Sequence, residues 1–267
     1  MANDIIKIEN LRRDFKVGSE TVHALRGISF SIRAGEFVTI MGTSGSGKST
    51  LLNTIAGTFP VDSGAITIDG EDITDLSEEK RARFLGRVFQ DPMMGTAADM
   101  WIEENMALAA RRGERRGLSW AISPADRENF RRLLSELDLG LEDRLSSKVG
   151  LLSGGQRQAL TLLMAVMKKP KVLLLDEHTA ALDPKTAAKV LELSDRFVAE
   201  GNLTTLMVTH NMKDAIAHGN RLIMMNAGKI VFDISGEEKK RLTVDDLLHA
   251  FTLSTAEEFA NDRILLS

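Results

Sequence analysis

The chain has 267 residues, 43% hydrophobic and 27% charged, which is typical of a soluble globular protein and not of a disordered or collagen-like one. It contains no cysteine, which excludes disulfides, thiol catalysis and cysteine-ligated metal clusters. The net charge of −4 gives no electrostatic reason to expect a nucleic-acid partner. The longest uncharged run, residues 49–61, is too short for a membrane span. The acidic first ten residues also differ from a secretory signal peptide.

Hydrophobic periodicity predicts strands in the first 70 residues. Apolar residues alternate with polar ones at Ile6 and Ile8 and again over residues 22–32, which is typical of a half-exposed sheet. Residues 37–41 form an uninterrupted apolar run, as expected of a strand buried on both faces. A glycine-rich turn follows, then a helix predicted from Lys48 to near Gly57, and a short strand over 65–68.

The middle of the chain has a helical pattern from about residue 92 to residue 149. Ser123, Pro124 and Asp126 form a helix start, and apolar residues follow at helical spacing from Phe130 to Leu137. We interpret this stretch as a helical subdomain inserted into an α/β core.

Strands alternate with helices again after residue 170. Strands are predicted at 172–175 and 203–208, with helices ending near Gly201 and Gly219, a hairpin around 226–229, and a terminal helix starting at Thr243. This order predicts an α/β fold with a mainly parallel sheet.

A phosphate-binding loop is the strongest motif. Residues 42–49 match G-x-x-x-x-G-K-[ST] without a mismatch, between a buried strand and a helix, which is the context that the motif requires. Glycines let backbone N–H groups turn toward a triphosphate, and the helix N-terminus adds positive charge. Lys48 is expected at the β- and γ-phosphates, Ser49 on Mg²⁺, and Thr50 at a phosphate. The predicted cradle comprises Gly42, Thr43, Ser44, Gly45, Ser46, Gly47, Lys48, Ser49 and Thr50.

Two acids end the apolar strand at 172–175. Ligands of parallel sheets bind at the carboxyl ends of strands, so Asp176 is placed to orient Mg²⁺ and Glu177 to polarise an attacking water. Two solvated surface acids are the alternative, which the upstream phosphate loop disfavours.

Residues 152–156 read Leu-Ser-Gly-Gly-Gln between these two motifs. With them, the chain resembles the ATP-binding cassette (ABC) ATPases, the nucleotide-binding subunits of ABC transporters, over roughly residues 5–234. The resemblance implies one P-loop NTPase (RecA-like) domain, with an α/β core and an antiparallel β subdomain at 1–90 and 155–235. A helical signature subdomain at about 91–154 and a short helical tail at 236–267 complete it.

The resemblance also implies roles for single residues. Gln90 resembles the glutamine that reaches Mg²⁺ and water, His210 the switch histidine at the γ-phosphate, and Asp183 the D-loop aspartate. Phe15 matches the ring that stacks on adenine, although it could be a core residue, and Gln90 could be an ordinary strand-end amide. The implied catalytic residues are Glu177, His210, Lys48 and Gln90. The implied Mg²⁺ ligands are Ser49, Gln90 and Asp176. Nucleotide contacts are added by Phe15, Asp183, Ser153, Gly154, Gly155 and Gln156.

One position departs from the family pattern. The family usually reads Asp-Glu-Pro-Thr after this strand, whereas this chain has His178 between Glu177 and Thr179. A proline would restrict the residue before it to extended geometry. We interpret His178 as a tolerated loop substitution, with titration or contact with the D-loop as the alternative.

Two surface features remain open. Met93, Met94, Met100, Trp101 and Met106 cluster after the Q-loop, where a membrane permease docks in the family; a helical core would look similar. The basic cluster of Arg111, Arg112, Arg115 and Arg116 is interpreted as a solvated loop, with lipid or partner docking as the alternative.

The resemblance finally implies partners. Two copies would sandwich ATP head to tail, so that the signature segment completes the site of the opposite subunit. The chain would lie at the cytoplasmic face of the membrane, bound to a separate permease. The resemblance favours a bacterial importer with an extracytoplasmic binding protein, in a subgroup that includes transporters of aromatic amino acids. An efflux or lipoprotein-release ATPase and a non-transport ATPase of translation or DNA repair are the alternatives.

Overall fold

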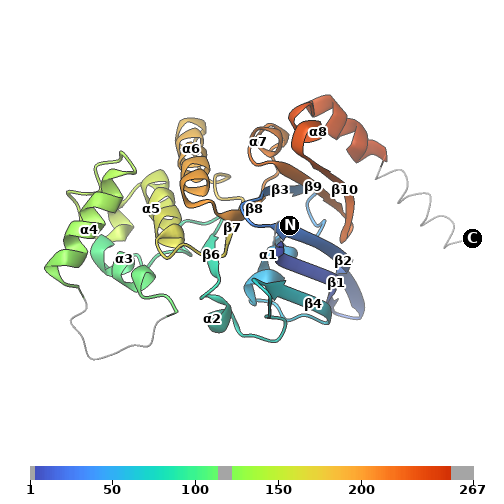
Figure 1. The fold of residues 1–267 in the computed structure, drawn as a ribbon, viewed down its shortest axis with the longest axis horizontal. Coiled ribbons are helices and arrows are strands. Elements are labelled where there is room, and N and C mark those ends of the chain that lie inside the picture. Colours follow the sequence, from blue (N-terminus) through green and yellow to red (C-terminus); the bar gives the residue numbers. More distant parts are fainter. Residues whose placement is uncertain (1–3, 114–121, 254–267) are drawn as a thin grey trace, which may run out of the picture. The chain divides into compact units, whose positions relative to one another are not determined.

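The computed structural model describes residues 4–113 and 122–253. The chain divides into two compact units. The first contains Met1–Ser77 and Thr204–Ser267, and the second contains Glu78–Leu203. Each unit is built around its own strands and helices (Figure 1), and each is described separately.

An antiparallel sheet forms one part of the first unit. It contains β1 (Asp4–Val17), β2 (Glu20–Arg33), β4 (Ser63–Ile68) and β5 (Glu71–Asp72), in the order β2-β1-β4-β5. The alternating apolar side chains lie on the buried face, as their period of two predicts. This sheet confirms the predicted antiparallel β part of the fold.

Parallel strands form the other part of the first unit. They are β3 (Phe37–Gly42), β8 (Thr204–Val208) and β9 (Arg221–Asn226), with β3 parallel to both neighbours. The antiparallel β10 (Lys229–Ser235) closes the predicted hairpin with β9. All of β3 except Gly42 and all of β8 are buried, which explains their uninterrupted apolar runs.

Three helices and a terminal helical segment accompany these strands. They are α1 (Lys48–Ala56), α7 (Met212–Ala217), α8 (Gly236–Lys240) and residues 244–253. Thr243 starts the last segment as predicted, because its Oγ accepts from the Asp246 N–H at 3.2 Å. Leu247 packs with Met41, Ala215, Leu222 and Met224, so the segment belongs to the core.

The second unit has two parallel strands and most of the helices. The strands are β6 (Leu85–Val88) and β7 (Val172–Asp176). The helices are α2 (Glu78–Arg81), α3 (Ile102–Ala110), α4 (Pro124–Ser135), the 3₁₀ turn η1 (Val149–Leu151), α5 (Gly154–Val166) and α6 (Pro184–Gly201). The parallel strands in both units confirm the mainly parallel α/β fold.

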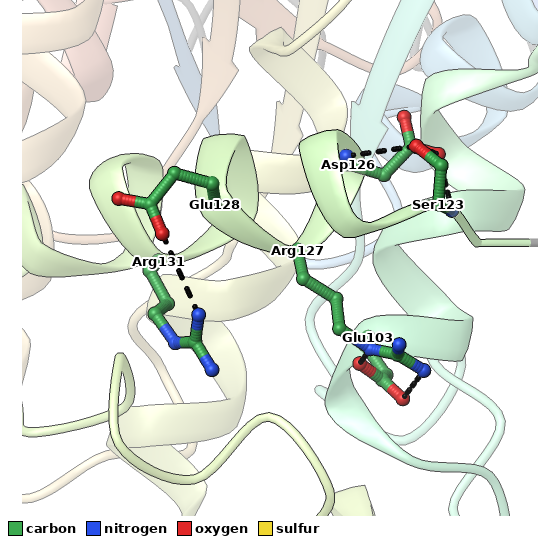
Figure 2. A network of polar contacts seen from close by, with 6 residues as sticks. All are labelled: Glu103, Ser123, Asp126, Arg127, Glu128 and Arg131. Atoms are coloured by element: carbon green, nitrogen blue, oxygen red, sulfur yellow. Dashed lines mark hydrogen bonds and ion pairs between the residues drawn. The ribbon is translucent and has the colours of Figure 1, made fainter.

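Polar contacts define how α3 and α4 meet (Figure 2). Ser123 and Asp126 form the predicted capping box of α4, and this hydrogen bonding lowers the pKa of Asp126. Arg127 of α4 donates two hydrogen bonds to the buried Glu103 of α3, at 2.7 and 3.2 Å. A buried carboxylate needs such a partner. The Arg127–Glu103 pair therefore links α4 to α3.

The structure corrects details of the sequence interpretation in the second unit. Only α3 and α4 are regular helices between residues 92 and 148 of the described chain, because turns occupy 92–100 and 136–148. Met106 is fully buried, so it belongs to the helical core and not to a docking surface. Arg112 donates to the Ala165 carbonyl near the end of α5 at 3.0 Å, and desolvation lowers its pKa, so this arginine is not simply solvated. Arg115 and Arg116 lie outside the described residues.

None of the helices in the described segments is both long enough and apolar enough to cross a membrane.

Candidate nucleotide-binding site

The glycine-rich loop after β3 wraps around the ammonium group of its own lysine. Lys48 is only 6% exposed, and its Nζ donates to the carbonyls of Gly42 at 2.9 Å and Thr43 at 2.7 Å. The Ser46 Oγ lies at 3.4 Å. The loop thus holds a buried cation from the first residue of α1, and positive partial charge also collects at this helix N-terminus. This arrangement suits an anionic phosphate.

Two other segments of the first unit hold the loop in place. The β9–β10 hairpin contacts it through the Gly228 N–H, which donates to the Ser46 carbonyl at 3.1 Å. A Cβ on Gly47 would lie 2.5 Å from the Ala24 carbonyl of β2, so only glycine permits this approach. Sequence patterns predicted the hairpin but gave no sign that it supports the loop.

Gly45 and Gly47 give a matched pair of substitutions. Both have left-handed φ angles, +78° and +99°, so alanine at either costs about 1–2 kcal/mol in backbone strain. A Cβ on Gly45 meets nothing within 4 Å, whereas one on Gly47 overlaps backbone. We expect Gly47→Ala to lower the free energy of unfolding more than Gly45→Ala. Chemical denaturation measures the difference, and equal stabilities would contradict the observed packing.

His210 lies at the same sheet edge as the phosphate loop. It follows β8, the parallel neighbour of β3, in an exposed turn before α7. The Thr209 N–H donates to the Ile40 carbonyl at 3.1 Å, and Asn211 caps α7, so both neighbours of His210 are fixed. The first unit therefore brings His210 and residues 42–50 to the carboxyl ends of adjacent strands.

Phe15 is a half-buried ring on β1. Its edge meets Phe59 with ring centroids 5.3 Å apart, and the Arg13 guanidinium lies 4.7 Å from its centroid. Arg13 is held by Asp62 at 2.6 Å. Val22, opposite Phe15 on β2, is 49% exposed. The ring is thus held by Phe59 and Arg13 next to an exposed apolar neighbour.

The second unit brings its own predicted residues together at one edge. Gln90 follows β6. Asp176 ends the parallel neighbour β7 and Glu177 follows it, with Val88 paired to Leu175. Gln90 is exposed, whereas both acids are half-buried. Glu177 has a left-handed φ of 44°, which is unusual for a residue with a side chain.

Arg87 is a residue of this edge that the sequence interpretation missed. Its guanidinium lies 3.8 Å from the Asp176 carboxylate and 4.4 Å from the centroid of Phe89. Desolvation lowers the pKa of Arg87, and Asp176 opposes that shift. The sequence Leu-Gly-Arg-Val could have indicated this residue, because an arginine inside a buried strand needs a partner of opposite charge.

The signature segment forms the N-terminus of α5. Ser153 and Gln156 make a reciprocal capping box at 3.2 Å. Ser153 and Gly154 are exposed, whereas Gly155 is buried, where a Cβ would lie 1.9 Å from Thr186 of α6. Further along α5, the buried Gln158 donates to the Phe89 carbonyl at 2.9 Å, which ties this helix to the segment before Gln90. No pattern in the sequence indicated that link.

Asp183 caps α6 and accepts from the Thr186 N–H at 3.1 Å. Hydrogen bonds from the Thr186 side chain and backbone lower the pKa of Asp183. A lowered carboxylate pKa adds stability above the unfolded pKa of about 3.9, and this is lost as pH falls through the folded pKa. We expect Asp183→Ala to lower the melting temperature at pH 7, and the loss relative to the wild type to shrink as pH falls through the folded pKa. Asp183→Asn, which still caps, should show a smaller loss at pH 7.

An intact phosphate loop with a buried lysine, at the carboxyl edge of parallel strands, defines a P-loop nucleotide-binding protein. The ABC transporter family matches residues 25–180. This chain belongs to that family, as its ATP-binding cassette. The match confirms the resemblance seen in the sequence, and members of this family bind and hydrolyse ATP.

Relatives within the family have different transport roles. The chain is 47% identical to a tyrosine transport ATP-binding protein of Clostridioides difficile, over 92% of this chain and 98% of that protein. It is 36% identical to the spermidine/putrescine import ATP-binding protein PotA of Haemophilus ducreyi and 34% identical to the macrolide export ATP-binding/permease protein MacB of Aggregatibacter actinomycetemcomitans. Those matches cover 86% and 95% of this chain but only 57% and 40% of the relatives.

Solved structures with this fold are also cassettes. The ATP-binding cassette MJ0796, described as a dimer in a post-hydrolysis state bound to ADP and Pi, has a TM-score of 0.75 at 31% identity. The match covers 86% of this chain and 98% of that one. CbiO1 of Clostridium perfringens, part of the transporter complex cbiONQ, has a TM-score of 0.71 at 27% identity, with coverages of 88% and 90%.

Proposed function

We propose that this chain binds and hydrolyses ATP with Mg²⁺ and thereby powers import of a small solute through a separate membrane permease. The phosphate loop carries this proposal, because its carbonyls hold the buried Lys48, the first residue of α1. The 47% identity to a tyrosine transport ATP-binding protein supports an amino acid, with aromatic amino acids as the first candidates.

The residues present suit Mg²⁺. Ser49, Gln90 and Asp176 supply hydroxyl, amide and carboxylate oxygens, which Mg²⁺ prefers together with substrate phosphates. When bound, Mg²⁺ would neutralise charge on the phosphates. Among the protein groups, Lys48 and His210 would stabilise the γ-phosphate, Glu177 would orient the water, and Gln90 would link the reaction to the permease. Phe15 would stack on adenine.

The working form would be a head-to-tail homodimer. The exposed Ser153 and Gly154 would then reach the partner's nucleotide together with Gly155 and Gln156, and Asp183 would lie near the interface. The cassette MJ0796, which is described as dimeric, supports the formation of a dimer. In the second unit, Met93, Met94 and Trp101 are 47%, 69% and 44% exposed, which suits a permease contact. The chain would thus act at the cytoplasmic face of the membrane, with an extracytoplasmic binding protein on the other side.

Reconstitution tests the importer role. The chain is co-purified with a candidate permease and placed in proteoliposomes. ATPase activity is then assayed with a binding protein loaded with tyrosine, methionine or spermidine. Stimulation by one loaded binding protein, with solute moving toward the cassette side, is expected. Solute moving away from the cassette, with no need for a binding protein, would favour export instead. The 34% identity to MacB makes export the second candidate.

A further inference from the structure

His178 replaces the proline that the family usually has, and the structure gives it a specific contact. The imidazole is 2% exposed, and its Nε2 lies 2.9 Å from the Oγ of Ser194, which is 1% exposed on α6. Both groups are therefore polar side chains inside the core of the second unit. Burying such groups without a hydrogen-bond partner costs free energy. The contact between His178 and Ser194 therefore lowers the cost of burying both side chains.

The direction of the hydrogen bond follows from the protons available. The Ser194 hydroxyl has one proton, and it donates to the Val190 carbonyl at 2.9 Å. With that proton used, its oxygen can accept from His178 in the tautomer that carries the Nε2 proton. The result is a chain of two hydrogen bonds from the loop after β7 to the backbone of α6.

Glu177, the residue before His178, has an unusual backbone. Its φ is 44°, and its carbonyl accepts from the Ala180 N–H at 2.9 Å in a tight turn. A left-handed conformation is unfavourable for a residue with a Cβ, and it persists only where the surroundings impose it. A proline at 178 would instead drive residue 177 toward a negative φ. The proline of the family therefore disfavours the observed backbone of Glu177.

We propose that His178 is a positioning residue, which fixes Glu177 in its left-handed conformation by anchoring the turn to Ser194. This inference rests on the proposed role of Glu177 in hydrolysis. A carboxylate that orients water must be held closely, since a misplacement of about 1 Å can cost on the order of 10²-fold in rate. The rigidity that proline gives to other family members comes here from a buried hydrogen bond.

Kinetics of the full chain with Mg-ATP test the proposal. We expect His178→Ala and Ser194→Ala each to lower kcat by about 10-fold or more while KM for ATP stays within about 2-fold. His178→Gln should restore most of kcat, because its amide can donate as Nε2 does. His178→Pro should lose activity while it still binds a fluorescent ATP analogue. Unchanged kcat in both alanine variants would overturn the proposal.

Two further comparisons separate positioning from stability. Thr161→Val removes a similar buried helix hydrogen bond, from Thr161 Oγ1 to the Arg157 carbonyl at 2.8 Å in α5. It should keep the wild-type kcat at a temperature where all variants are folded. His178→Ala added to Glu177→Gln should cause no further loss, and an additive loss would contradict positioning. If Glu177→Gln keeps normal turnover, the proposed role of Glu177 in hydrolysis is wrong. If Glu177→Gln loses turnover but His178→Ala keeps it, only the positioning role of His178 is wrong.

Discussion

Glu177→Gln is expected to lower ATP turnover by about 10²–10³-fold, the loss typical of removing one positioned group that acts in the transition state. Glutamine keeps the size of the side chain but removes the carboxylate that would polarise water. Because Glu177 lies after β7 and outside the phosphate loop, the variant should bind ATP as the wild type does. The measurements are steady-state phosphate release and the affinity for a fluorescent ATP analogue.

The same variant should also accumulate as an ATP-bound dimer. If hydrolysis separates the two subunits, a chain that binds ATP without cleaving it stays associated, and size-exclusion chromatography with ATP would show the dimer. Glu200→Gln removes an exposed carboxylate near the end of α6 and serves as the control, with unchanged turnover and association. Near-normal turnover of Glu177→Gln would falsify the role of Glu177.

Local motifs explain why much of the fold could be predicted. The buried runs at residues 37–41 and 172–175 and the caps at Ser123, Asp183 and Thr243 each depend on neighbours a few residues away. Their patterns are therefore written in short stretches of sequence. The phosphate loop belongs to this group too, since Lys48 bonds to carbonyls only five and six residues before it.

Contacts between distant segments could not be predicted in the same way. Arg87 meets Asp176 across 89 positions only because β6 and β7 pair in parallel, and Gln158 reaches Phe89 across 69. Met106 fitted both a docking surface and a core, and only the packing of α3 decided between them. His178 has the same limitation, because its partner Ser194 is defined by how α6 packs on the turn after β7.

Lys48→Met is expected to weaken ATP binding by about 10²-fold or more. A hydrogen bond to a charged group contributes about 1.5–3 kcal/mol, and about 1.4 kcal/mol corresponds to a tenfold change in affinity. Methionine preserves the unbranched stem, which is buried, and removes only the charge and its donors. Lys48→Arg should also bind weakly, because a planar guanidinium does not fit a space that holds a compact ammonium between two carbonyls.

The charge of Lys48 also affects stability. Melting temperatures with and without ATP separate its effect on the folded loop from its effect on ATP binding. Without nucleotide, the ammonium donates to the Gly42 and Thr43 carbonyls, so Lys48→Met removes this donor and should lower the melting temperature of the nucleotide-free chain. Saturating ATP should raise the melting temperature of the wild type but not of Lys48→Met, because stabilisation by a ligand requires binding. Lys185→Met, at an exposed position of α6, removes the same charge and should respond to ATP as the wild type does. A normal ATP-induced shift in Lys48→Met would show that the nucleotide is held elsewhere.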